Sequence, residues 1–207
     1  VDWSPRGAPL VQVLDRRQGR AQVLAVDVAT GRTTLIREQS DPCWVDVVHG
    51  VPTWGPTGRL LTVEVSGDCY ALCEEGVPLT PPHLQVRAVL DVGDDDVLVS
   101  GSTHPVEEHV WRWSAAGTEA ITAHPGVHTA TRGGATLVTV SASLDAALPA
   151  ASVTVSGRVA ATLVALAVPG QLGGRARDRS GDAVDHVVAI VGHVGDDRPG
   201  FRGTGRE

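Results

Sequence analysis

The chain has 207 residues and a formal net charge of −7, because 17 basic residues, all of them arginine, stand against 24 Asp and Glu. This acidic balance disfavours a protein that binds nucleic acid through its own charge. With 42% hydrophobic and 20% charged residues, the composition is that of a globular protein and excludes disorder over most of the chain. The apolar runs fall short of the ~20 residues that a membrane-spanning helix needs, so we expect no membrane span.

A Gly-centred turn followed by a short apolar run recurs along the chain at Gly31, Gly76, Gly117 and Gly157. The spacings between these glycines are 45, 41 and 40 residues. Around each turn the sequence predicts strands rich in Val, Leu and Thr. In chain order the expected strands are 10–14, 22–28 and 33–36; 44–48, 60–65, 68–73 and 77–80; 85–92, 97–99, 109–114 and 119–122; and 128–132, 137–140, 152–155 and 160–163.

A period of about 40 residues that carries four short strands is typical of a β-propeller blade. Helical solenoids share this period, but the Gly, Pro, Asp and Ser residues between the runs leave too little room for helices. Several runs, such as 23–26 and 137–140, are close to continuously apolar rather than alternating, as strands covered on both faces are. The first repeat lacks a full innermost strand, which is cut off or reduced to residues 1–3.

We therefore expect an all-β chain, a partial β-propeller of about four blades with four antiparallel strands each, forming an arc of a larger ring. The two terminal blades of such an arc would expose apolar faces. The propeller is expected over residues 1–168 and an irregular tail over 169–207, where the strand period is lost. Two interpretations of the tail stay open: a stretch translated out of frame, or the start of a linker to a missing hydrolase domain. The chain begins with Val and contains no Met, so we interpret it as a fragment.

Four short segments, 41–46, 82–91, 109–114 and 125–128, resemble in the same order the propeller domain of bacterial dipeptidyl peptidase IV-like serine peptidases. The resemblance implies that an eight-bladed propeller caps a C-terminal α/β-hydrolase domain, and that the whole enzyme releases dipeptides from peptide N-termini, often after proline. It places this chain in the second half of the propeller, after the glutamate pair with which that family holds the substrate's amino group. The chain contains no G-x-S-x-G motif, so we expect no catalytic triad and no activity from this chain alone.

Two acidic pairs, Glu74–Glu75 and Glu107–Glu108, could be mistaken for such an amine clamp. Neighbouring residues on a strand point to opposite faces, and neither pair has the sequence context of the family's motif. We interpret the first pair as part of a solvated blade turn, and expect no functional role for either.

A cluster of possible metal ligands is formed by the pair Glu107–Glu108 together with His104 and His109. Its spacing matches neither H-x-x-E-H nor H-E-x-x-H. We interpret it as a loop that enters a blade strand rather than a metal site. Trp111 and Trp113 share one strand face and are expected to pack against the next blade. The same structural role is expected of the remaining tryptophans, Trp3, Trp44 and Trp54.

The other polar features are interpreted as structural. Asp94–Asp96 should form a solvated turn without calcium, and Arg16, Arg17 and Arg20 should lie exposed around a hairpin turn. The chain has three cysteines, an odd number without C-x-x-C spacing, so we expect no disulfide framework, no zinc site and no nucleophilic thiol. Unpaired cysteines also favour a cytoplasmic location for the protein. The cysteines are Cys43, Cys69 and Cys73.

The sequence thus predicts no catalytic residue, no metal ligand and no cofactor, and leaves the substrate-binding residues unknown. The leading hypothesis is a substrate-gating propeller fragment whose partners are a C-terminal α/β-hydrolase domain and peptide substrates. The alternative is a non-catalytic propeller that serves as a protein-interaction scaffold. A frameshifted remnant without function is the third hypothesis, motivated by the tail.

Overall fold

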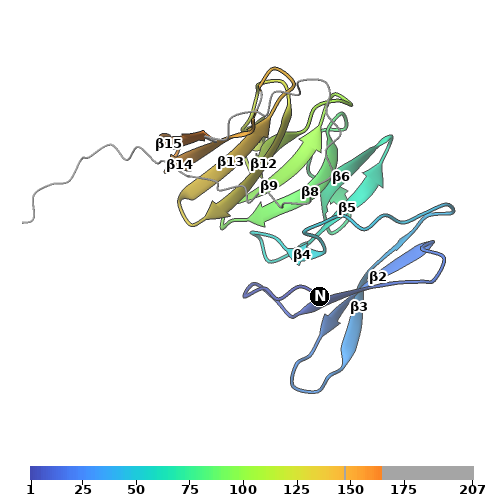
Figure 1. The fold of residues 1–207 in the computed structure, drawn as a ribbon. Helices are drawn as coiled ribbons and strands as arrows, with labels where there is room; N and C mark the ends of the chain where they lie inside the picture. The colour runs from blue at the N-terminus through green and yellow to red at the C-terminus, as the bar shows by residue number, and fades with distance from the viewer. Residues whose placement is uncertain (147, 165–207) are drawn as a thin grey trace, which may run out of the picture.

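The structure is a computed structural model that describes residues 1–146 and 148–164. Within these residues the chain forms four antiparallel β-sheets that follow one another in chain order (Figure 1). The strands are β1 (Leu10–Leu14), β2 (Arg20–Val26) and β3 (Thr33–Ser40) in the first sheet; β4 (Thr53–Trp54), β5 (Leu60–Ser66), β6 (Cys69–Glu74) and β7 (Val77–Pro78) in the second; β8 (Gln85–Val92), β9 (Asp96–Ser102), β10 (His109–Ser114) and β11 (Gly117–Ala120) in the third; and β12 (Val127–Gly133), β13 (Thr136–Ala142), β14 (Ala150–Val155) and β15 (Arg158–Val164) in the fourth.

Within each sheet every strand pairs with the next one in the sequence, which is the meander of a propeller blade. The first sheet has three strands, and a single bridge between Asp2 and Leu10 stands where an innermost strand would pair. The predicted all-β partial propeller, with an incomplete first blade, is therefore confirmed. No helix in the described residues is long and apolar enough to cross a membrane.

The four repeated glycines lie at the turn between the last two strands of each sheet. Their φ angles are +69° at Gly31, +83° at Gly76, +127° at Gly117 and +78° at Gly157. A side chain disfavours this left-handed backbone, whereas glycine adopts it freely. The repeat seen in the sequence is thus a repeated turn conformation, and it explains why all four blades end alike.

The largest hydrophobic cluster fills the space between the second and third sheets. It includes Leu61, Val63 and Leu72 from the second sheet and Val97 and Val99 from the third, all at most 5% exposed. A smaller cluster joins the first sheet to the second and is built from Leu10, Val23 and Leu60. Blade stacking therefore supplies the core, since no single sheet could bury both of its faces alone.

The predicted strand over residues 44–48 is wrong. The innermost strand of the second sheet is β4, and residues 44–48 belong to the connection that leads to it. The segment resembles a strand in the sequence because it carries apolar residues. The side chains of Val45 and Val48 are indeed buried, but the backbone of residues 44–48 belongs to no sheet. Past this segment, Gly50 has a φ of +82° and lies against the backbone carbonyl of Val89 in β8, so that a Cβ would overlap that oxygen.

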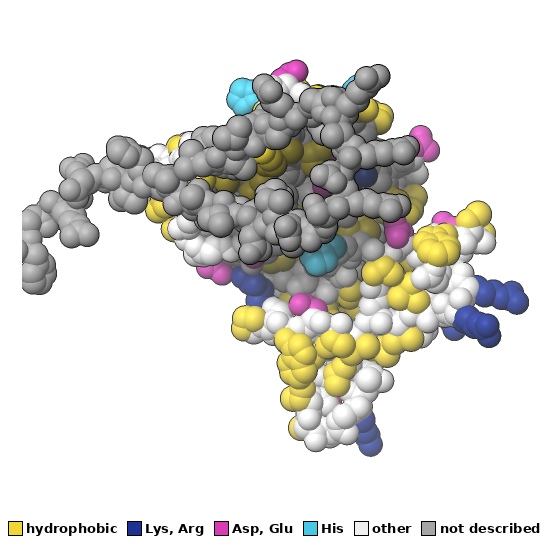
Figure 2. Space-filling view, viewed as in Figure 1, with side chains coloured by type: hydrophobic (Ala, Val, Ile, Leu, Met, Phe, Trp, Pro, Cys, Tyr) yellow, Lys and Arg dark blue, Asp and Glu magenta, His cyan; other side chains and the backbone are white. Residues whose placement is uncertain are grey.

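The first and fourth sheets, at the ends of the arc, expose aliphatic side chains. Figure 2 shows hydrophobic side chains on the surface over the first sheet, in the lower part of the view. Val13 and Leu35 there are 44% and 51% exposed, and Val140 and Val155 of the fourth sheet are 38% and 41% exposed. The boundary predicted at residue 168 and the predicted tail over 169–207 lie outside the described residues.

Candidate functional site

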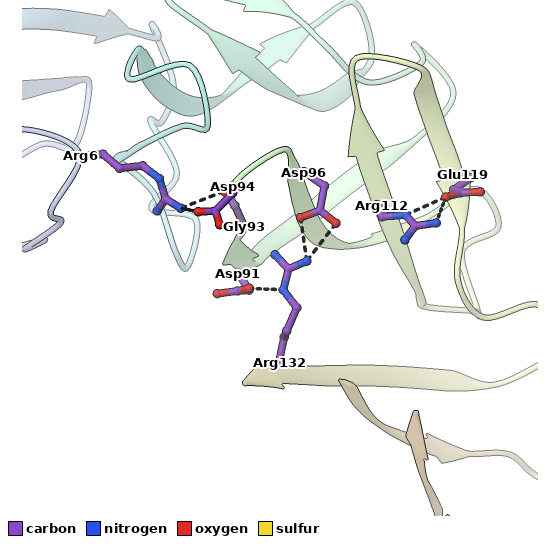
Figure 3. Close-up of polar contacts among 8 residues, drawn as sticks. All are labelled: Arg6, Asp91, Gly93, Asp94, Asp96, Arg112, Glu119 and Arg132. Carbon is purple, nitrogen blue, oxygen red and sulfur yellow. Dashed lines mark hydrogen bonds and ion pairs between the residues drawn. The ribbon is translucent and has the colours of Figure 1, made fainter. Parts of the chain in front are cut away.

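The most strongly charged site lies where the turns after the innermost strands of two neighbouring blades meet. Arg132, near the end of β12, is paired with Asp91 of β8 and with Asp96, the first residue of β9 (Figure 3). Its Nη1 lies 2.7 Å and 2.9 Å from the two carboxylate oxygens of Asp96. One guanidinium of the fourth sheet thus bridges two carboxylates of the third.

The Arg132 side chain is only 17% exposed. Burial alone would lower the pKa of Arg132, but hydrogen bonds and charge attraction from Asp96 and Asp91 outweigh it and raise that pKa. The cation is therefore permanent at any pH of interest. Its Nη2 is buried and has no hydrogen-bond partner among the described residues. Gly93 leaves the room for this nitrogen, since a Cβ there would lie 2.6 Å from it.

A second arginine reaches the same turn from the beginning of the chain. Arg6 Nη2 donates to the carbonyl oxygen of Gly93 at 2.9 Å and to Asp94 at 3.1 Å. These contacts tie the segment before β1 to the third sheet, two blades away. Arg6 and Arg132, with the turn residues 91–96 and Gly134, line a cavity of about 520 Å³. We call it the Asp–Arg cavity.

The Asp–Arg cavity can hold charged or polar groups, because both cations and carboxylates line it. Among the described residues, its lining contains Asp, Arg, Gly and Val but no Ser, Cys or His. The contacts seen within it are ion pairs and hydrogen bonds that hold blades together.

At the opposite end of β12 the same two blades meet through a pair of histidines. The rings of His109 and His128 stack with their centroids 5.1 Å apart and an angle of 20° between their planes. His109 Nε2 lies 3.1 Å from a carboxylate oxygen of Glu107, while His128 contacts Ser141 at 2.8 Å and the carbonyl oxygen of His124 at 2.7 Å. His109 Nδ1 lies 3.3 Å from the hydroxyl of Thr122, so all four ring nitrogens have a hydrogen-bond partner within the protein.

Between these two contacts the third and fourth sheets enclose a cavity of about 810 Å³. Hydroxyl side chains are prominent in its lining, among them Thr139, Ser141, Ser152 and Thr154. The interface differs from the one between the second and third sheets, where aliphatic side chains interlock. The polar contacts of Arg132 and the histidines therefore carry a larger share of the attachment of the fourth blade.

The predicted acidic pairs do not form an amine clamp. Glu74 accepts hydrogen bonds from Thr57 and Arg59, whereas the neighbouring Glu75 lies exposed in the turn with a φ of +49°. In the second pair, Glu107 contacts His109 and Glu108 accepts a hydrogen bond from Ser100. Each carboxylate is thus directed to its own partner or to solvent, and His104 lies exposed.

Among residues 1–146 and 148–164, no group of three or more His, Cys, Asp or Glu side chains is arranged to hold a metal ion. The three cysteines are free thiols. Burial raises the pKa of Cys73 to about 11, which leaves almost no thiolate at neutral pH. Cys43 is exposed and Cys69 is half-buried.

The tryptophans divide into two groups. Trp111 and Trp113 pack at a blade interface, as predicted, but it is the one with the preceding, second sheet rather than with the next. Trp54 contacts the smaller cluster and donates to the carbonyl oxygen of Ala8 at 2.7 Å. Trp3 and Trp44 are 73% and 56% exposed, so the expectation that they pack against a blade is wrong. Both lie outside the sheets, in connecting segments.

The turn predicted at residues 94–96 is present, but only one of its three carboxylates has no ion-pair partner among the described residues. Asp94 pairs with Arg6 and Asp96 with Arg132, whereas Asp95 is exposed. Sequence reasoning missed both arginines, because their partners lie 88 and 36 residues away and no local pattern relates them. Arg16, Arg17 and Arg20 are exposed around their hairpin turn, as expected.

Comparison with known proteins decides the family. A family model described as the dipeptidyl peptidase IV (DPP IV) N-terminal region matches residues 1–147. The chain belongs to this family. The matched part contains the first three sheets and the Asp–Arg cavity, and it ends within the fourth sheet.

Among solved structures, the chain is similar to Porphyromonas gingivalis dipeptidyl peptidase 4, with a TM-score of 0.60 and 18% sequence identity. The superposition covers 72% of this chain and 23% of that chain. At this identity the likeness supports the DPP IV-type fold alone, and this chain spans less than a quarter of its structural relative. A search of curated proteins found no match.

Proposed function

We propose that this chain is part of the substrate-gating propeller of a DPP IV-like serine exopeptidase, an enzyme that releases N-terminal dipeptides from peptides. The single observation that supports it is the family match over residues 1–147. The catalytic α/β-hydrolase domain would lie outside this chain, which has no G-x-S-x-G motif.

The fold supports a gating role by geometry rather than by catalysis. Stacked blades form the rigid wall of a chamber, and the blades close only if each sheet is held to the next. Arg6 and Arg132 make such contacts at the turns after the innermost strands. In the proposed enzyme this wall limits access to short peptides with a free amino terminus.

The test begins with the DNA on both sides of the coding region. We expect a downstream reading frame that encodes a G-x-S-x-G elbow followed by Asp and His. The longer product should hydrolyse a Gly-Pro chromogenic amide but not its N-acetylated form, and the 207-residue chain alone should hydrolyse neither. Absence of a hydrolase in every frame, or turnover by this chain alone, would contradict the proposal, and the former would favour the scaffold alternative.

A further inference from the structure

A small pocket lies between the end of β3 with the connection that follows it and the β5–β6 hairpin of the second sheet. Its volume is about 230 Å³, below the ~300–1,000 Å³ of pockets that enclose a drug-sized ligand. It is large enough for one side chain of a partner. We call it the linker pocket, and the residues that matter below are Asp41, Trp44, Val45, Asp46, Val65 and Tyr70.

The connection that forms one wall is held in place before any partner arrives. Asp41 Oδ1 accepts hydrogen bonds from the backbone N–H groups of Cys43 at 2.7 Å and Trp44 at 2.9 Å. The N–H of Val45 donates to the carbonyl oxygen of Gln18 at 2.7 Å, and the Val45 side chain is 6% exposed. Trp44, between these two anchors, is nevertheless 56% exposed. Because the backbone that carries Trp44 is already held in place, binding has less of the chain to order.

The opposite wall adds apolar surface and a second aromatic ring. Val65 near the end of β5 is 59% exposed, and Tyr70 at the start of β6 is half-buried. Two of the carboxylates in the lining are neutralised within the chain. Arg37 donates to the carboxylate of Glu64 through both Nε and Nη2. Arg20 Nη1 lies 3.9 Å from a carboxylate oxygen of Glu38.

The remaining carboxylates, Asp41 and Asp46, have no basic partner in the part of the chain that the structure describes. Burial first, and then the negative charges of Asp46 and Asp41, raise the pKa of Tyr70. Both carboxylates thus act on the aromatic wall. The lining of the linker pocket combines valine side chains, two aromatic rings and two carboxylates without a basic partner among the described residues.

We propose that the linker pocket docks an arginine side chain of a basic peptide segment. A guanidinium is planar, stacks on aromatic faces and pairs with carboxylates, and its aliphatic stem suits the apolar surface of Val65. An acidic side chain would be repelled by Asp41 and Asp46, and a neutral one would form no ion pair with them. The proposal does not depend on peptidase function, because docking needs no free amino terminus and no catalytic domain.

The test uses the full 207-residue chain and the peptide acetyl-Ala-Leu-Arg-Leu-Ala-amide, whose blocked ends exclude recognition of a terminus. Binding is followed by NMR through the indole N–H resonance of Trp44, identified by its loss in Trp44→Phe. The matched control peptide carries citrulline, an uncharged isostere of arginine. In the protein, Asp46→Asn removes one charge but keeps the oxygen that accepts the Val47 N–H. Glu75→Gln removes the same charge from an exposed turn at the far end of β6.

We expect the arginine peptide to shift the Trp44 resonance and the citrulline peptide to bind at least about tenfold more weakly. Asp46→Asn should weaken binding about threefold or more, and Glu75→Gln should leave it unchanged. The proposal fails if the Trp44 resonance does not shift at about 5 mM peptide, a range that covers weak millimolar affinity. Equal binding of both peptides would mean that the guanidinium charge is not recognised, and equal effects of the two substitutions would mean attraction to net charge alone. Either result would also overturn the proposal.

Discussion

Replacing Arg132 with Met tests whether one guanidinium holds the fourth blade to the third. Met retains an apolar side chain that can occupy the space of the arginine stem but leaves Asp96, 19% exposed, and Asp91, 37% exposed, without their cation. Removing one partner of a fully buried ion pair costs about 3–5 kcal/mol. Because water reaches Asp91, we expect a smaller loss, about 2–3 kcal/mol of unfolding free energy.

The matched control is Arg112→Met, the same substitution in the pair of Arg112 with Glu119 on neighbouring strands (Figure 3). These side chains are 44% and 59% exposed, so the loss should stay within about 1 kcal/mol. Urea denaturation followed by tryptophan emission gives both values, since Trp111 and Trp113 lie in the third sheet.

A double-mutant cycle of Arg132→Met with Asp96→Asn separates the pair from other effects. We expect a coupling of about 1–2 kcal/mol. An Arg132→Met variant that loses no more stability than Arg112→Met, or a coupling near zero, would show that the ion pairs do not attach the blade.

Three further predictions concern other parts of the molecule. Burial alone would raise the pKa of Glu64, but hydrogen bonds led by Arg37 lower it from its ordinary 4.5. The contribution of Glu64 to stability should therefore be present above pH 4.5 and be lost as the pH falls through the lowered value. Glu64→Gln should flatten a curve of unfolding free energy against pH measured below pH 4.5. Iodoacetamide at pH 8 should alkylate the exposed Cys43 in the native chain and Cys73 only after unfolding, because burial raises the pKa of Cys73 to about 11. Peptide mass spectrometry locates the alkylated cysteines. Rapid labelling of Cys73 in the native chain would contradict this prediction. Gly50→Ala should lower the free energy of unfolding by more than about 3 kcal/mol in urea denaturation, since a Cβ would overlap the backbone of β8. Gly58 has a φ of +74° and open space around it, so Gly58→Ala should lower that free energy by only about 1–2 kcal/mol. Equal losses would refute the steric argument.

The blade repeat could be predicted because it rests on local chemistry. Turn glycines such as Gly76 and Gly157 need a left-handed backbone, and short Val- and Leu-rich runs favour strands whatever lies around them. The failure at residues 44–48 has the same origin. Val45 and Val48 are buried like strand residues, yet nothing within that segment reveals that its backbone is tied to the β1–β2 turn instead of a neighbouring strand.

Local pattern was therefore enough to predict the repeat of blades in the described part of the chain, because each hairpin forms between neighbouring segments. Which charges meet could be learned only from the folded molecule. Arg6 finds Asp94 across 88 residues and Arg132 finds Asp96 across 36, and such pairs depend on how the sheets stack, which no local pattern encodes. The exposure of Trp44 was decided in the same way, because the anchors on either side of it turn an apolar residue outward rather than into a core.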